Sequence, residues 1–136
     1  MAGRGTVRLS PVDSAHLIWP HLEASLIRVK EKTGERWSPP FVLDRINDGR
    51  AGLFRFHEDG KHLGYCIVER YEQGEAPWMN VWIVEGEGVE HAPECLAALD
   101  DLARRIGAVA WRATGRKGWK AIGLKPVAVV YEREVI

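Results

Sequence analysis

The sequence predicts an α+β (α/β) fold in which a mixed, mainly antiparallel sheet is flanked by helices. Residues 51–84 contain three strand-like apolar runs separated by short, glycine-containing turns. Segments with apolar side chains at helical spacing lie before and after this meander. The chain has 136 residues, the size of one ordinary domain. We therefore expect a single domain over residues 1–136.

The N-terminal third predicts one short strand and two helices. The strand is expected at residues 6–9, and the first helix contains LIWPHLEASLIRVKEK. Pro20 has no backbone N–H, so it is expected in the first turn of this helix or at a kink. Gly34 is typical of its end. A second, shorter helix is expected to start after the N-cap Ser38 and to close at Gly49.

The middle of the chain predicts a three-stranded meander of AGLFRFH, HLGYCIVERYE and PWMNVWIV. Asp59-Gly60 is a typical hairpin turn, and Gln73-Gly74-Glu75 provides the second turn. Alternation places Leu63, Tyr65 and Ile67 on one face of the second strand. The third run is apolar on both faces, which indicates a central strand.

The last third predicts a long helix and a β-α-β ending. The helix is PECLAALDDLARRIG, followed by the strand AVAWRA, a short helix in GRKGWKAIG and a final strand in PVAVVYEREV. The arginines near the end of the long helix are favourable for its dipole. The expected order is therefore β-α-α-β-β-β-α-β-α-β.

This order resembles the GNAT acetyltransferase superfamily over nearly the whole chain. GWKAIGLKPV is similar to the family's Tyr-x-x-x-Gly-Phe step, with Gly123 and Leu124 in the Gly-Phe place. The resemblance implies that the strand before the main helix splays from the next strand and pairs with the pantetheine arm of acetyl-CoA. GRKGWKAIGLKPVAVVYERE is also similar, more weakly, to GNAT-like proteins of tailed phages, some of which are virion components.

The resemblance implies five cofactor-binding positions if acetyl-CoA binds: Trp82, Ile83, Val84, Gly86 and Gly88. The loop VEGEGVEHAPECLAAL nevertheless departs from the family pattern. Its glycines come too early, and a proline without an N–H stands near the Gly-x-Gly place. Its four glutamates would repel a diphosphate more strongly than a helix N-terminus attracts it. We therefore expect no cofactor, and acetyl-CoA only in the alternative function below.

Proton transfer would also need substitutes in this chain. The resemblance places Trp119 where many family members have the tyrosine that protonates the leaving thiolate, and indole is no useful acid. Tyr131 is the nearest phenol, and Glu69 and Glu85 are the general-base candidates. The structural alternatives are a half-buried strand aromatic for Tyr131 and solvent-facing charges for the two glutamates.

The net charge is zero but unevenly distributed. Residues 71–103 carry eight acids and no Lys or Arg, and residues 104–125 carry seven bases and no acid. We expect either two solvated faces or a surface for a protein partner or self-assembly. Nucleic acid is disfavoured, because the strongly basic footprint is missing. The basic and aromatic residues of that surface are Arg112, Arg116, Lys117, Trp119 and Lys120.

Other residue patterns exclude several classes of protein. No apolar run approaches a membrane span, no secretory leader is evident, and no metal-ligand spacing occurs. The two cysteines, Cys66 and Cys95, fit buried thiols in a reducing compartment. The expected location is the cytoplasm, or a host cytoplasm or virion if the chain is phage-encoded.

Two functions follow. The first is a non-catalytic GNAT-like protein with a degenerate acetyl-CoA loop, acting through protein contacts, in one form as a phage virion or assembly component. The alternative is a divergent N-acetyltransferase that uses an acyl-CoA to acylate an amine. The sequence leans toward the first, because the phosphate loop and the tyrosine are both altered.

Overall fold

A computed structural model describes residues 6–86 and 92–113, with residues 124, 125, 127, 133 and 135. Within these residues one sheet has the strand order β1-β2-β3-β4-β5. Neighbouring strands are antiparallel except β4 and β5, which are parallel. This is the mixed, mainly antiparallel sheet that the sequence predicts. The strands are β1 Val7–Pro11, β2 Gly52–Glu58, β3 Lys61–Gln73, β4 Ala76–Gly86 and β5 Ala110–Ala113.

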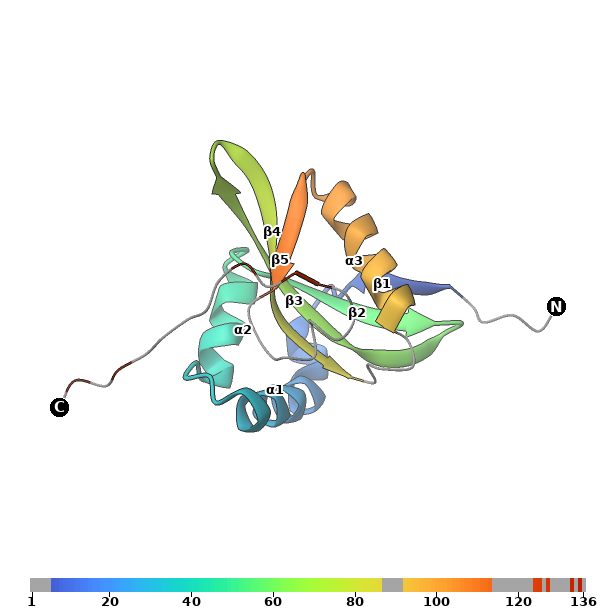
Figure 1. The fold of residues 1–136 in the computed structure, drawn as a ribbon. Helices are drawn as coiled ribbons and strands as arrows, with labels where there is room; N and C mark the ends of the chain where they lie inside the picture. Colours follow the sequence, from blue (N-terminus) through green and yellow to red (C-terminus); the bar gives the residue numbers. More distant parts are fainter. Residues whose placement is uncertain are drawn as a thin grey trace.

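Helices cover both faces of the sheet, as Figure 1 shows. A short 3-10 helix, η1 (Ala15–Ile18), leads into α1 (Trp19–Thr33), and α2 (Pro39–Asn47) follows. α1 and α2 cover one face, and α3 (Ala92–Arg105) covers the other. The described order from β1 to β5 agrees with the first eight predicted elements. The last predicted helix and strand lie outside the described residues, apart from isolated positions.

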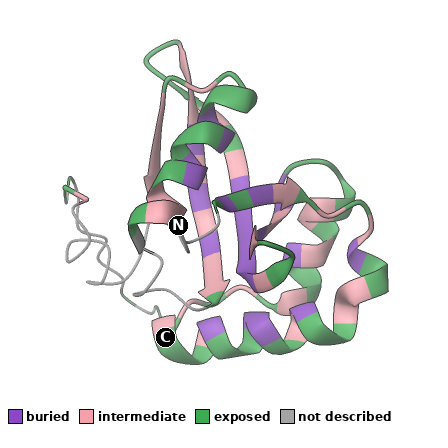
Figure 2. Cartoon of the chain, turned by 90° about the vertical axis from the view of Figure 1, so that its right-hand side faces the viewer, coloured by how far each residue is buried: buried purple, intermediate pink, exposed green. Residues whose placement is uncertain are grey.

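The three layers enclose two apolar cores. The core under α1 and α2 includes Leu22, Leu26 and Val42, all essentially inaccessible to solvent. The core under α3 includes Leu99 and Leu102, also inaccessible. Figure 2 shows the buried positions along the sides of the helices that face the sheet. Each helix is thus held by its apolar face rather than by propensity alone.

The helix ends confirm the local sequence signals. Pro20 lies in the first turn of α1 and therefore causes no kink. Gly34 closes α1 in the left-handed conformation, with φ of 70°. Ser38 Oγ accepts a hydrogen bond of 3.3 Å from the backbone N–H of Phe41 at the start of α2.

One expectation for the second meander strand is wrong. Phe56 pairs with Gly64 and His57 with His62, so Leu63 is an extra residue in β3. Such a bulge reverses the alternation of side chains. Leu63 therefore lies in the core under α3, whereas Tyr65 and Ile67 lie in the core under α1 and α2.

The described part of the chain contains neither a membrane-spanning helix nor a cluster of metal ligands. No helix there is both long and apolar enough to cross a membrane. Within the same residues, no group of three or more His, Cys, Asp or Glu could hold a metal ion.

Candidate functional site

The strand β4 extends beyond its described pairing with β5. The parallel pairs run from Trp78 with Ala110 to Val81 with Ala113. β4 continues to Gly86, and within the described residues 82–86 have no partner on the β5 side. In Figure 1, β4 continues past the last described residue of β5. Among the described residues, the β5 side of residues 82–86 is therefore unpaired, and this segment, called the free strand edge below, offers backbone N–H and C=O groups for pairing.

A bulge marks the start of this free strand edge. Ile67 pairs with Ile83 and Val68 with Val81, so Trp82 is an extra residue in β4. A bulge bends its strand and increases the local twist. β4 therefore changes direction at the residue where its described pairing with β5 stops.

The three residues expected to hold pantetheine are anchored by their side chains. Trp82 contacts Trp37 and Phe41 edge-on, each at 6.3 Å between ring centroids. Ile83 is buried in the core under α1 and α2, and Val84 packs against the core under α3. Only their backbone could therefore meet a ligand along the edge.

The free edge ends at a glycine whose role is structural. A Cβ on Gly86 would lie 2.2 Å from the carbonyl oxygen of Leu63. Its φ is 145°, which also favours glycine. Close approach of β3 thus explains Gly86 without a bound phosphate. Gly88, the second glycine expected to bind the cofactor, lies outside the described residues.

Glu85 joins β4 to α1. Ser25 Oγ donates a hydrogen bond of 2.9 Å to Glu85 Oε2, and Arg28 Nε donates one of 3.0 Å to Oε1. Ser25 is 1% exposed, and its Oγ also accepts a hydrogen bond of 3.0 Å from Arg28 Nη2, so the three side chains form one hydrogen-bonded group. Glu85 therefore links α1 to the sheet through these hydrogen bonds.

Glu69, the other candidate base, is held by two donors on the same side of the sheet. Arg45 of α2 forms an ion pair of 2.5 Å with Glu69 Oε2. Asn80 Nδ2 donates to Oε1 at 3.4 Å from the neighbouring strand. Both candidate bases thus face α1 and α2, and each is engaged by an arginine.

A cluster of rings beside Glu85 was not predicted. His21 Nδ1 and the Tyr65 hydroxyl are 2.8 Å apart, and the His62 ring lies 4.7 Å from that of Tyr65. Burial raises the pKa of Tyr65 and, with Arg55 and His21, lowers the pKa of His62. His62 is thereby kept in the neutral form that accepts a proton near pH 7. The alternation of β3, which pairs Tyr65 with Glu85, is the signal that could have located this cluster.

The expected interaction surface is described at one position. The Arg112 guanidinium carbon lies 5.5 Å from the ring centroid of Trp78 and 5.9 Å from that of Tyr71. The other four residues, and the candidate acid Tyr131, lie outside the described residues: Arg116, Lys117, Trp119 and Lys120.

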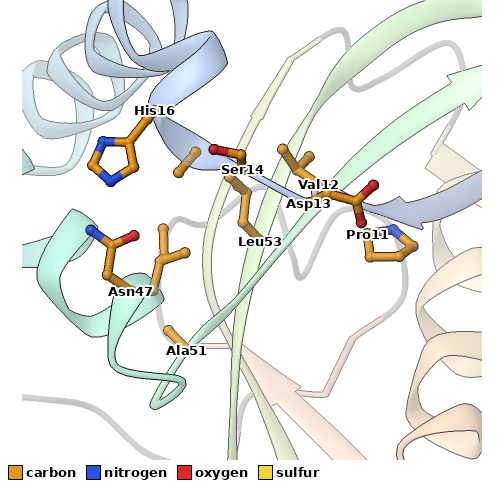
Figure 3. A pocket seen from close by; sticks show the side chains of 10 residues that line it. Pro11, Val12, Asp13, Ser14, His16, Asn47, Ala51 and Leu53 are labelled. Carbon is orange, nitrogen blue, oxygen red and sulfur yellow. The ribbon is translucent and has the colours of Figure 1, made fainter.

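A pocket of about 390 Å³ lies away from all of these residues, between the β1–η1 connection and the end of α2. In Figure 3 the side chains of His16 and Asn47 gather on one side, and the Asp13 carboxylate lies on the other, near Pro11. No predicted site residue lines the pocket. Its lining consists of Pro11, Val12, Asp13, Ser14, Ala15, His16, Ile46, Asn47, Ala51 and Leu53.

Comparisons with solved structures identify the fold. A GNAT family acetyltransferase from Staphylococcus aureus superposes with a TM-score of 0.63 at 11% identity, over 96% of this chain and 99% of that one. A ribosomal-protein-alanine N-acetyltransferase from Brucella melitensis gives 0.64 at 14%, over 96% and 98%. An aminoglycoside acetyltransferase from an uncultured soil metagenomic sample gives 0.60 at 12%, over 96% and 97%.

Comparisons of the sequence itself found no match. No protein-family model matches the chain, and no curated protein matches it. The solved structures show that the chain has the GNAT fold, as its order of elements predicts, and the three neighbours named above are acetyltransferases.

Proposed function

We propose that this chain binds an acyl-CoA thioester between β4 and β5 and transfers its acyl group to an amine. The observation that carries the proposal is the free strand edge at residues 82–86, which has no partner on the β5 side within the described part of the chain. An extended chain of amides can pair with such an edge through main-chain hydrogen bonds. The pantetheine arm of CoA has two amides and suits that form of pairing.

The chemistry would place the amine on the side of α1 and α2. The amine nitrogen attacks the thioester carbonyl, a C–N bond forms, and the C–S bond breaks with release of the thiolate. Glu69 or Glu85 would take the proton from the amine after its carboxylate separates from the arginine that pairs with it. Tyr131 would return a proton to the thiolate in this proposal.

A second function, action through protein contacts without catalysis, rests on a different observation. Pro93 lies in the first turn of α3, where it offers no N–H to a phosphate, and Glu94 follows it. An assembly or virion component of a tailed phage is the form that the C-terminal resemblance suggests. Such a protein would work in the host cytoplasm or in the particle.

Calorimetry with acetyl-CoA separates the two functions. Binding of acetyl-CoA at micromolar concentration would support acyl transfer and contradict the non-catalytic function. No binding at millimolar acetyl-CoA would contradict acyl transfer. Hydrogen exchange adds the location. Ligand should slow exchange of the amides in residues 82–84 that point away from β3, while amides between β1 and β2 serve as the internal control.

The protein-contact function has its own test. Reversing Arg116 and Lys117 together to glutamate should weaken an assembly measured by light scattering. A control reversal of Arg50, an exposed residue after α2, should leave the assembly intact. If both variants assemble like the original chain, the basic block is a solvated face.

A further inference from the structure

We propose that Arg112, Tyr71 and Trp78 form a binding site for a carboxylate carried by the acyl acceptor. The three side chains are called the arginine–aromatic site below. The assignment to the acceptor rests on the proposed acyl transfer, but carboxylate binding can be measured without it. The acceptor would then be an amine that also bears a carboxylate, such as an amino acid or a peptide.

The arginine–aromatic site is built on three adjacent strands. Tyr71 of β3 pairs with Trp78 of β4, and their ring centroids lie 6.4 Å apart. Arg112 of β5 places its guanidinium over both rings, within the range of a cation–π interaction. The three side chains are half-buried, and the hydrogen-bonded strands hold them in place. A site on strands is positioned more precisely than one on loops.

Within the part of the chain that the structure describes, two buried polar atoms of this site have no hydrogen-bond partner. They are Nε of Arg112 and the hydroxyl oxygen of Tyr71. Native proteins pair the large majority of such groups, and each exception calls for an explanation. Arg112 Nε is a donor, and a phenol hydroxyl can donate as well. A bound acceptor group would satisfy both.

The charge of Arg112 has no partner carboxylate in the described part of the chain. Glu69 lies one strand beyond Asn80, the residue that pairs with Arg112. The Glu69 carboxylate is already engaged, because it accepts a hydrogen bond from the Asn80 amide and forms an ion pair with Arg45. A half-buried guanidinium without a counter-charge favours an anion.

The donor set matches a carboxylate better than a phosphate. One guanidinium and one neutral hydroxyl supply a single positive charge, which balances a monoanion and leaves a phosphate dianion undercompensated. The planar guanidinium fits the two oxygens of a carboxylate, and hydrogen bonds to ionised partners are the strong ones. The two aromatic rings would contact the carbon atoms next to the carboxylate.

The test uses three dipeptides that differ in their carboxylates, added to the full chain without acyl-CoA. Ala-Ala has a C-terminal carboxylate, Ala-Glu-amide has only a side-chain carboxylate, and Ala-Ala-amide has none. The indole N–H resonance of Trp78 reports binding by NMR. At least one of the two acids should shift this resonance at millimolar concentration, and the one that does identifies the source of the carboxylate. The neutral amide should not shift it.

Matched variants assign the effect to the site. Arg112→Met should weaken binding of that acid by about tenfold or more, because an ionic hydrogen bond is lost. Arg50→Met removes the same charge from an exposed position and should change nothing. Tyr71→Phe should weaken binding severalfold without lowering the melting temperature, because the deleted hydroxyl has no hydrogen-bond partner among the described residues.

Several results would overturn the proposal: equal binding of acid and amide, no binding by either acid, no effect of Arg112→Met, or a clear loss of stability in Tyr71→Phe. The failure of acyl transfer is separate. Acid binding without acetyl-CoA binding keeps the arginine–aromatic site and removes its role for an acyl acceptor. Acetyl-CoA binding without acid binding removes only the site.

Discussion

Gly64 and Gly86 face each other across β3 and β4 at a separation that excludes a side chain on either strand. A Cβ on Gly64 would lie 2.0 Å from the carbonyl oxygen of Glu85, and one on Gly86 would lie 2.7 Å from the Cα of Gly64. Both obstacles are backbone atoms, which cannot move aside as a flexible side chain can. This glycine pair lets the two strands approach closely at the end of β4.

Gly64→Ala should therefore destabilise the fold through steric conflict alone. We expect a loss of about 3 kcal/mol in the free energy of unfolding, the upper part of the range for overpacking. Urea denaturation measures the loss. Gly74→Ala is the matched control, because its Cβ would meet nothing within 4 Å and only the positive φ of 58° is strained. That control should cost about 1 kcal/mol, and equal losses would contradict the steric explanation.

Replacing Glu85 by alanine should lower stability even if the residue also takes part in catalysis. The change leaves the buried Ser25 hydroxyl without the acceptor of its hydrogen bond and removes the carboxylate that pairs with Arg28, whose hydrogen bond to Ser25 Oγ remains. Hydrogen bonds to charged groups contribute about 1.5–3 kcal/mol, so we expect a loss of about 2 kcal/mol. Thermal or urea unfolding measures it.

A double-mutant cycle checks the mechanism of this loss. Ser25→Ala and Glu85→Ala together should cost less than the sum of the single changes, because they share one hydrogen bond. Additive losses would show that the serine and the glutamate act independently. Glu72→Ala, at an exposed position of β3, is a control that should leave stability nearly unchanged.

The local features of the fold could be predicted because their causes lie within a few residues. Ser38 begins α2 by capping Phe41, three residues away, and Gly34 ends α1 by adopting a positive φ. The central place of β4 follows from its apolar residues on both faces. The order of these signals along the chain is enough to predict helices packed on a mixed sheet.

The bulges and the site contacts could not be predicted because they depend on partners distant in sequence. The extra residues Leu63 and Trp82 exist only relative to the strand that each pairs with. Ser25 and Glu85 lie 60 positions apart in the sequence, so no local pattern predicts the hydrogen bond between them. The close approach of Gly86 to Gly64 is hidden for the same reason, because the two glycines lie 22 positions apart in the sequence.

Both cysteines should react slowly in the native protein. Burial, with Glu94 and Glu58 nearby, raises the pKa of Cys95 to about 11, and burial also raises the pKa of Cys66. Since the thiolate is the nucleophile, alkylation by iodoacetamide at pH 8 should be on the order of 100-fold slower than in urea. Mass spectrometry of timed samples measures the rate, and rapid labelling of folded protein would contradict the burial.

Stability should fall as the pH drops through the range in which His62 would be protonated. Its pKa lies below the ordinary value of 6.5, chiefly because of burial, then because of Arg55 and His21, with Glu85 opposing them. Below about pH 7 the unfolded chain therefore binds more protons at this position than the folded chain, and protonation favours unfolding. The contribution is complete above the unfolded pKa and is lost as the pH falls through the folded pKa.

Urea unfolding from pH 7.5 to 5 tests this dependence. His62→Gln should flatten the decline in the free energy of unfolding, because the titrating imidazole is gone. His16→Gln, at an exposed position of η1, should follow the original chain. An unchanged pH profile in His62→Gln would assign the decline to other groups, and a greater stability of the original chain at pH 5 would reverse the sign argued here.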